Sequence, residues 1–264
     1  MKKHLVFVML LVLTVSLLAG CSGQKTSSVL DKIKTSGKVV VGTSADYAPY
    51  EYVDEAGKFT GFDIELMTEI ARRMGVELVW TDMPFDSLIA AVQEGKIDMS
   101  ISCFNYTEER DAQVDFSDAY YTSEDAFLVT DAFTGTITDP LEVAKYKIGV
   151  QSGTVQDDWV TTELVGAGLM PESQLSRYER VDQASLDLKS GRIDVLVADS
   201  VPAKAIMQQQ TGLKIVYEGM LYTGPINIVL PNGDTALQAE VNKIIKALQD
   251  EGFIDALAVK YFSE

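Results

Sequence analysis

Short apolar runs alternate with amphipathic helical stretches along most of the chain. Residues 38–43 and 76–80 are rich in Val and predict two buried strands. Between them, apolar residues recur at helical spacing over 61–75, and the stretch ends in glycine. A helix at 85–92 and an apolar strand at 97–101 continue the alternation. Strands that alternate with helices indicate parallel sheets in an α/β fold.

The same pattern recurs weakly later in the chain. The sequence IAAVQEGKIDMSI at 89–101 resembles SLDLKSGRIDVLV at 185–197, and the strand and glycine loop at 40–44 resemble 148–154. Two similar α/β lobes would explain both repeats, and coincidence is the alternative because Gly-Lys-Ile-Asp is a common way to leave a helix. Ligands of open α/β sheets bind beyond the carboxyl ends of the strands. The repeat therefore predicts that the ligand site is formed by residues 44–47, 102–105, 151–154 and 198–199.

The C-terminal part of the chain is predicted to be helical. A last apolar run at 226–230 predicts a strand. Two helices are then expected, separated by Gly252. The apolar face of the first helix consists of Leu237, Val241, Ile244 and Leu248.

The N-terminus has the pattern of an export signal. Two lysines precede an apolar stretch at 5–18, which is too short to span a bilayer comfortably. The stretch ends in LAGC at 18–21, which resembles the bacterial lipobox, so Cys21 is predicted to be lipidated and to become the first residue of the mature chain. An ordinary cleaved signal with an incidental cysteine is the alternative. If Cys21 is lipidated, residues 22–28 form a flexible tether to the membrane.

Composition excludes several classes of function. The net charge of −17 makes nucleic acid and anionic lipid surfaces improbable partners. Apolar residues make up 47% of the chain, enough for one large core or two moderate ones. The only histidine, His4, lies in the predicted signal, so histidine-based catalysis and ordinary zinc sites are not expected in the mature domain. No catalytic residue, metal or cofactor is predicted.

The stretch SCFNYTEER at 102–110 joins a predicted strand to a helix. Thr107 is a good N-cap, and the acidic residues after it suit the positive end of the helix dipole. Arg110 breaks this pattern, because its cation stands where a capping box would have Glu or Gln. A guanidinium can bind a carboxylate through two hydrogen bonds, so an anionic ligand is one interpretation. The alternative is a surface ion pair of Arg110 with Glu109 or Asp111.

Several short motifs, each weak alone, follow one another in a characteristic order. They are GT and YAPYEY within 42–52, TGFDI at 60–64, FDSLI at 85–89, GKID at 95–98, TEER at 107–110, VDFS at 114–117, QSGT at 151–154 and KYF at 260–262. In this order and spacing, the chain resembles the extracytoplasmic amino-acid-binding proteins of ABC importers, in the polar amino acid group known as family 3. The resemblance covers 38–262.

The resemblance implies an α/β fold with two lobes, the periplasmic-binding-protein type II fold. Each lobe would be a mixed, mostly parallel sheet flanked by helices, and a two-stranded hinge would cross near 129–131 and 223–227. The expected division is a signal peptide at 1–20, a tether and leading helix at 21–36, lobe 1 at 37–129, lobe 2 at 130–224, and a return to lobe 1 at 225–264.

The resemblance also implies roles for residues that match the family pattern. Arg110 would hold the α-carboxylate of a free amino acid, assisted by backbone N–H groups of Ser102, Asn105 and Thr154. Asp199 would take the α-ammonium group, with the Ser102 carbonyl as a second acceptor. Considered without the family, Asp199 has the alternative role of capping the helix that follows it.

Closure of the lobes would complete the site. A zwitterion that enters the cleft loses its water, which is costly unless both charges are matched. Because Arg110 and Asp199 would come from different lobes, the match is complete only in the closed form. Tyr47 and Phe85 would sandwich the ligand side chain, and plain core packing is the alternative for both.

Departures from the family pattern affect the expected specificity. Many members have Asp at the position of Ser44, so this chain lacks that fixed charge. An acidic ligand would require a second pocket cation, and none is obvious. We therefore expect a polar or basic amino acid. The polar residues expected near its side chain are Ser44, Asp46, Glu51, Asn105 and Gln151, and Cys103 also departs from the common pattern.

The expected partners are a free amino acid, an ABC permease with its ATPase, and the membrane through Cys21. The chain is expected to be monomeric and to lie outside the cytoplasm, anchored to the cell envelope. Two rival functions remain open. One is an enzyme on the same fold, of the cyclohexadienyl dehydratase type, and the other is a stand-alone amino-acid-sensing lipoprotein.

Overall fold

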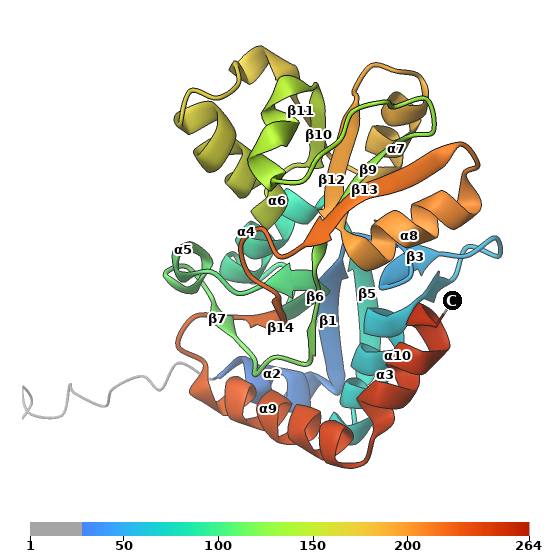
Figure 1. The fold of residues 1–264 in the computed structure, drawn as a ribbon. Helices are drawn as coiled ribbons and strands as arrows, with labels where there is room; N and C mark the ends of the chain where they lie inside the picture. Colours follow the sequence, from blue (N-terminus) through green and yellow to red (C-terminus); the bar gives the residue numbers. More distant parts are fainter. Residues whose placement is uncertain (1–27, 264) are drawn as a thin grey trace, which may run out of the picture.

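Two lobes, each built on its own β-sheet, make up the part of the chain that the structure describes (Figure 1). The structure is a computed structural model, and it describes residues 28–263. The predicted signal peptide and Cys21 lie outside these residues. Within 28–263, no helix is both long enough and apolar enough to cross a membrane. The predicted α/β fold with two lobes of mixed sheet is confirmed.

The sheet of lobe 1 has the strand order β5-β1-β6-β14-β7, and β8 also pairs with β14. β1 runs parallel to β5 and β6, whereas β14 is antiparallel to β6. A small antiparallel sheet, β2-β3-β4, lies beside it. The strands are β1 (Lys38–Thr43), β2 (Asp46–Tyr47), β3 (Glu51–Val53), β4 (Phe59–Thr60), β5 (Glu77–Asp82), β6 (Met99–Asn105), β7 (Asp115–Phe116), β8 (Tyr121–Thr122) and β14 (Pro225–Leu230).

The sheet of lobe 2 has the order β11-β10-β12-β9-β13. β10 runs parallel to β11 and β12, and β9 is antiparallel to both of its neighbours. The carboxyl ends of β10 and β12 therefore meet at one edge, which faces lobe 1 (Figure 1). The strands are β9 (Asp125–Thr130), β10 (Ile148–Gln151), β11 (Leu175–Tyr178), β12 (Val195–Asp199) and β13 (Leu213–Gly219).

Helices cover the faces of both sheets, as parallel strands require. Lobe 1 has α2 (Val29–Ser36), α3 (Phe62–Met74), the short 3₁₀ helix η1 (Phe85–Ser87), α4 (Leu88–Gln93), α5 (Glu108–Asp111), α9 (Thr235–Asp250) and α10 (Phe253–Phe262). Lobe 2 has η2 (Pro140–Lys145), α6 (Val155–Trp159), η3 (Val160–Gly166), η4 (Glu172–Gln174), α7 (Val181–Lys189) and α8 (Ser200–Gln209).

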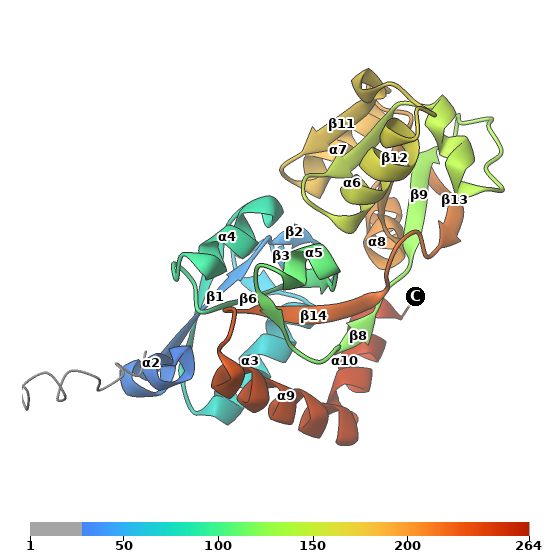
Figure 2. The ribbon, with the colours of Figure 1, turned by 90° about the vertical axis from the view of Figure 1, so that its left-hand side faces the viewer.

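The chain crosses between the lobes in two places (Figure 2). It leaves lobe 1 after β8 and enters lobe 2 at β9, and it returns between β13 and β14. The boundary expected at 224/225 coincides with the start of β14. The boundary expected at 129/130 falls within β9, whose residues already pair in the sheet of lobe 2. The domain boundaries drawn from the sequence stay a prediction.

Apolar side chains at the predicted positions form the cores. Val39 and Val41 of β1 are fully buried, and the predicted face of α9, from Leu237 to Leu248, packs into lobe 1. Gly252 has a left-handed backbone and separates α9 from α10, as predicted. Each fully buried aliphatic side chain stabilises the fold by about 1.5–3 kcal/mol, so these faces fix both C-terminal helices against the sheet.

β6 is longer than its apolar run predicts. The strand was expected at 97–101 with a loop after it, but it runs through Asn105 and all its residues are buried. The physical reason is β14, which pairs Ile226 with Asn105 and Asn227 with Phe104. Hydrogen bonds from a strand so distant in sequence hold the polar stretch in the sheet, and local patterning does not reveal them.

A close backbone approach fixes the start of α3. Gly61 has φ 128, and a Cβ there would lie 2.2 Å from the carbonyl oxygen of Tyr50. The N–H groups of Phe62 and Asp63 donate to the carbonyls of Pro49 and Tyr50 at 3.0 and 2.9 Å. The first turn of α3 is therefore held against the segment before β3, which brings Asp63 beside the candidate site.

Replacing Gly61 by alanine should destabilise the fold strongly. The added Cβ meets a backbone oxygen and the backbone angle suits only glycine, so we expect a loss of about 3 kcal/mol in the free energy of unfolding. Gly37→Ala is the matched control, because Gly37 also has a positive φ but has open space around it, and it should cost only about 1 kcal/mol. Urea unfolding measures both, and equal losses would contradict the close approach.

Candidate ligand-binding site

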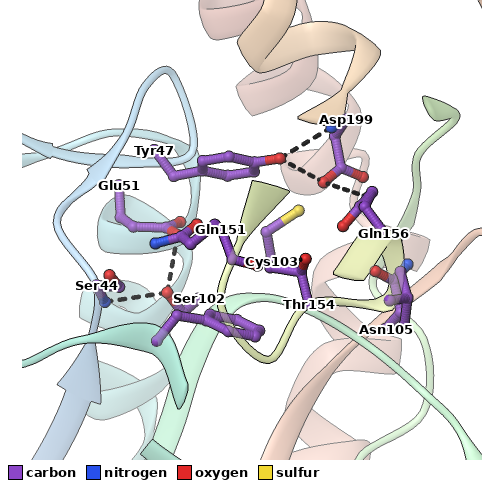
Figure 3. Close-up of a pocket in the computed structure, with 12 residues that line it drawn as sticks. Ser44, Tyr47, Glu51, Ser102, Cys103, Asn105, Gln151, Thr154, Gln156 and Asp199 are labelled. Carbon is purple, nitrogen blue, oxygen red and sulfur yellow. Dashed lines mark hydrogen bonds between the residues drawn. The ribbon is translucent and has the colours of Figure 1, made fainter. Parts of the chain in front are cut away.

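A pocket between the lobes lies at the carboxyl ends of strands from both sheets (Figure 3). β1 and β6 of lobe 1 and β10 and β12 of lobe 2 supply side chains, at the strand ends that the repeat nominated. The cavity volume of the pocket is only about 10 Å³, so the lobes stand almost closed on it in this structure. Its lining residues are Ser44, Tyr47, Glu51, Phe85, Ser102, Cys103, Asn105, Gln151, Thr154, Val155, Gln156 and Asp199.

Most of the predicted site residues line this pocket, and Asp46 and Arg110 do not. Two residues that we did not predict, Val155 and Gln156, line it as well. Both lie in the first turn of α6, directly after the predicted Thr154. Helical side chains lean toward the N-terminus of their helix. The position of Val155 and Gln156 directly after a strand-end loop could therefore have predicted that they reach the pocket.

Tyr47 and Asp199 join the two lobes across the pocket. The Tyr47 hydroxyl donates to Asp199 Oδ2 at 2.7 Å and accepts a hydrogen bond from the Asp199 backbone N–H at 2.9 Å. Asp199 is at the N-cap position of α8, but its carboxylate makes no capping bond. The capping alternative therefore does not describe the side chain, which points into the pocket (Figure 3).

Several donors surround the Asp199 carboxylate. Ser123 donates to Oδ1, and Gln156 Nε2 donates to Oδ2 at 3.3 Å. Gln156 also donates to Asp125 Oδ1 at 2.7 Å, so one amide bridges two carboxylates. Burial raises the pKa of Asp125 to about 7, and the charge of Asp199 adds to this shift. Burial also raises the pKa of Asp199. This end of the pocket suits a positive group.

Arg110 is buried at the edge of the pocket and bridges the lobes. Its Nη1 donates to the Asn105 carbonyl and its Nη2 to the Gly153 carbonyl, each at 2.8 Å. Its Cζ lies 5.6 Å from the ring centroids of Phe85 and Phe104. Among residues 28–263 no carboxylate forms an ion pair with it, so the surface-pair alternative is wrong. Thr107 caps α5 as predicted.

Burial lowers the pKa of Arg110. An arginine keeps its charge even so. Within 28–263, its guanidinium donates hydrogen bonds only to carbonyl oxygens, and a buried cation in that state has capacity for an anionic partner. Arg110 does not line the pocket in this closed arrangement.

Glu51 forms the floor of the pocket at the other end. The backbone N–H of Ser44 donates to Ser102 Oγ at 3.0 Å, and the Ser102 hydroxyl donates to Glu51 Oε1 at 2.8 Å (Figure 3). Glu51 Oε2 is fully buried and has no hydrogen-bond partner among the described residues. A buried oxygen of this kind is ready to accept a hydrogen bond from a ligand.

Asp46 contacts the opposite lobe instead of the pocket. Its Oδ2 accepts the backbone N–H of Val181 at 2.6 Å, and its Oδ1 accepts the Ser44 hydroxyl at 2.7 Å. Beside it, Arg180 of lobe 2 binds both carboxylate oxygens of Asp82 in lobe 1, at 2.9 and 3.0 Å. Asp46 and these neighbours therefore hold the rims of the lobes together.

Tyr47 and Phe85 belong to the apolar core and also line the pocket. Phe85 stacks on Phe104 with ring centroids 4.4 Å apart, and Tyr47 packs in the large core cluster of the molecule. Each nevertheless lines the pocket. The two interpretations of these residues are thus compatible. Within 28–263, no group of three or more His, Cys, Asp or Glu side chains is arranged to hold a metal ion.

The fold and the pocket define a class of protein: two α/β lobes, crossed twice by the chain, that enclose a small polar ligand between strand ends. The chain belongs to the bacterial extracellular solute-binding proteins, family 3, whose family model matches residues 39–264. The probable histidine-binding protein of Campylobacter jejuni is 32% identical over 263 residues, 99% of each chain. The arginine-binding extracellular protein ArtP of Bacillus subtilis is 30% identical over 266 residues, 100% of this chain and 99% of that protein.

Solved structures resemble this one over most of its length. A mutant of the arginine-binding protein ArgBP from T. maritima aligns with a TM-score of 0.82 and 36% identity, covering 89% of this chain and all of that one. An ancestral arginine-binding protein bound to arginine has a TM-score of 0.80 and 34% identity, covering 86% and 99%. An ancestral amino acid-binding protein described as a precursor of cyclohexadienyl dehydratase aligns with a TM-score of 0.79 and 32% identity. The alignment covers 89% of this chain and 100% of that one.

The contact between Arg180 and Asp82 should favour the closed arrangement. Arg180→Ala removes this contact and the longer hydrogen bonds that Arg180 donates to Ser44 and Asp46 at 3.5 and 3.4 Å. Ligand affinity should fall about threefold, because a partly exposed ion pair contributes about 0.5–1 kcal/mol. Lys38→Ala is the control, because Lys38 pairs with Glu77 on a neighbouring strand of the same lobe. Calorimetry with the bound amino acid measures both variants, and equal affinities for Arg180→Ala and the unaltered protein would contradict the role.

Proposed function

We propose that this protein captures a free amino acid in the pocket between its lobes and delivers it to an ABC importer. The observation that carries the proposal is the pair of buried, opposite charges at the pocket. Asp199 comes from lobe 2 and Arg110 from lobe 1, and the charge of Asp199 is among the influences on the pKa of Arg110. An α-amino acid carries an ammonium and a carboxylate on the same carbon atom, so groups from both lobes can match its two charges, and family membership supports the same interpretation.

The two ends of the ligand head would be bound by different lobes. Asp199 and Gln156 would receive the α-ammonium group, and Arg110 would bind the α-carboxylate in place of a backbone carbonyl. In the closed form both protein charges are buried, so the zwitterion gains contacts there that neither lobe offers alone. Closure is then favoured because the ligand binds the closed form more tightly than the open form.

The ligand side chain would extend toward Glu51. Ser44, Gln151 and the free oxygen of Glu51 offer polar contacts there, and Phe85 and Tyr47 offer ring faces. This lining suits a polar or basic side chain. Several relatives are named for arginine or histidine, which supports a basic ligand. A screen of the twenty amino acids, ornithine, citrulline and cystine by thermal shift would identify it, since a ligand at 100 times its Kd stabilises a fold by ~2.7 kcal/mol.

Loss of either charge should weaken amino acid binding severely. Arg110→Ala and Asp199→Ala each leave a ligand charge buried without its partner, so we expect affinity to fall by 10²-fold or more, on the order of 3 kcal/mol. Titration calorimetry with the amino acid selected by the screen measures the loss. Arg192→Ala is the control, because Arg192 is exposed and pairs with Asp187 on lobe 2. Less than about a fivefold loss in both variants would reject the proposed roles.

An enzyme on the same fold is the second candidate, because one structural neighbour is described as a dehydratase precursor. A dehydratase requires a positioned acid or base, and Glu51 is the buried carboxyl group with a free oxygen in the pocket. Incubation with prephenate or arogenate, followed by absorbance of the aromatic product, tests for turnover. Binding of these compounds without turnover would favour the transport function.

The proposed location is the outer side of the cell membrane, with a lipid on Cys21 as the anchor. An ABC permease and its ATPase would be the partners that receive the ligand. We expect Cys21→Ser to appear in the soluble fraction, because a chain without lipid lacks the anchor and is too acidic to bind anionic membranes. Fractionation and globomycin sensitivity measure the change. Membrane retention of Cys21→Ser would contradict lipid anchoring, and normal amino acid uptake after deletion of the protein would contradict transport.

A further inference from the structure

Two carboxyl groups are buried side by side beneath the pocket. Glu51 and Asp63 are both inaccessible to solvent, and their side chains lie within hydrogen-bonding reach of each other. Asp63 accepts the Tyr120 hydroxyl at 2.9 Å and the Cys103 backbone N–H at 2.8 Å. Among the described residues, Glu51 accepts a hydrogen bond only from the Ser102 hydroxyl; its Oε2 is buried without a donor, and Glu51 lines the pocket. Asp63 therefore positions Glu51 from behind, without touching the ligand space itself.

Two such groups cannot both be ionised in this environment. Burial raises the pKa of Asp63 to about 7, and burial together with the charge of Asp63 raises the pKa of Glu51 well above its ordinary range. Among residues 28–263, no lysine or arginine forms an ion pair with either carboxyl group. The titratable groups that do face it are Asp46 and Tyr47 on β2, Tyr50 before β3, Cys103 on β6 and Tyr120 before β8.

We infer that Glu51 and Asp63 share a proton that sets the charge of the pocket floor, and that a ligand with a cationic side chain displaces it. The inference rests on the proposed function, because it takes the ligand to be an amino acid. A guanidinium or ammonium group that reaches Glu51 Oε2 favours the ionised carboxylate. The carboxyl O–H bond then breaks and its proton passes to the solvent buffer. A neutral side chain of the same shape accepts or donates a hydrogen bond and leaves the proton in place.

The consequence is a ligand preference that depends on pH. Release of a proton makes the affinity for a cationic amino acid increase as pH rises, because fewer protons compete for the pair. The affinity for a neutral amino acid does not follow this dependence. At lower pH the floor is neutral and the advantage of the cationic ligand diminishes. Asp63 is thus a positioning residue for specificity, and Glu51 is the group that contacts the side chain.

Arginine and citrulline form the matched ligand pair, because they have similar shapes and differ only in the terminal group, a charged guanidinium in arginine and a neutral urea in citrulline. Calorimetry at about pH 7 in buffers of different ionisation enthalpy counts the protons released by each. We expect arginine to release roughly half a proton or more beyond citrulline. Glu51→Gln and Asp63→Asn should each abolish this difference. In the unaltered protein, arginine affinity should rise roughly three- to tenfold per pH unit from about pH 6 to about pH 8.

Asp125→Asn is the control for the other titratable carboxyl near the pocket. Asp125 lies beside Asp199 and responds to the α-ammonium group, which both ligands carry. Asp125→Asn should therefore keep the difference between arginine and citrulline. If it abolishes that difference, or if arginine and citrulline release equal numbers of protons, the inference is overturned.

Additional measurements distinguish a loss of folding from a loss of proton release. Circular dichroism and thermal melting establish whether each variant folds. If Asp63→Asn fails to fold, Tyr120→Phe replaces it in the test. Tyr120→Phe keeps both carboxyl groups but removes a hydrogen-bond donor to Asp63, so it should shift the pH dependence of arginine binding. If citrulline does not bind, the comparison of arginine between the unaltered protein and Glu51→Gln decides. A flat pH dependence of arginine binding would also reject the inference. Failure of every amino acid to bind would instead reject the proposed function.

Discussion

The contact between the Tyr47 hydroxyl and Asp199 is the interaction on which the relative position of the lobes depends. It joins residues 152 positions apart, one from each lobe, through two hydrogen bonds in a buried setting. A buried polar group that loses its partner costs about 1–3 kcal/mol unless water replaces it. Opening the lobes therefore requires solvent to enter the site. The closed arrangement, in turn, holds Asp199 ready for a positive group.

Around that contact, negative groups outnumber positive ones. Glu51, Asp63, Asp125 and Asp199 are all buried near the pocket, whereas Arg110 is the buried cation beside it. The protein reduces this imbalance by proton sharing at the floor and by hydrogen bonds from Gln156 and Ser123 near Asp199. A site so constructed attracts a ligand that brings positive charge, and it repels one whose side chain is acidic.

Strand periodicity and the rule about strand ends predicted much of this site from the sequence. Ser44, Ser102, Gln151 and Asp199 follow or end predicted strands, so their convergence could be expected. The direction of Asp46 could not, because a two-residue strand paired with β3 turns it toward Val181 of the other lobe. The left-handed backbone of Cys103, φ 49, and the extension of β6 likewise depend on partners distant in the chain, Asp63 and β14.

The place of β14 has a consequence for how the protein is made. This strand lies between β6 and β7, yet nearly the whole of lobe 2 separates it from them in the chain. Until residues 225–230 have emerged, β6 exposes an unpaired edge along a strand whose residues are all buried in the folded protein, which is a hazard for association with other chains. Lobe 2 can complete its own sheet before that point, whereas lobe 1 can do so only afterwards. The N-terminal lobe is thus the later of the two to mature.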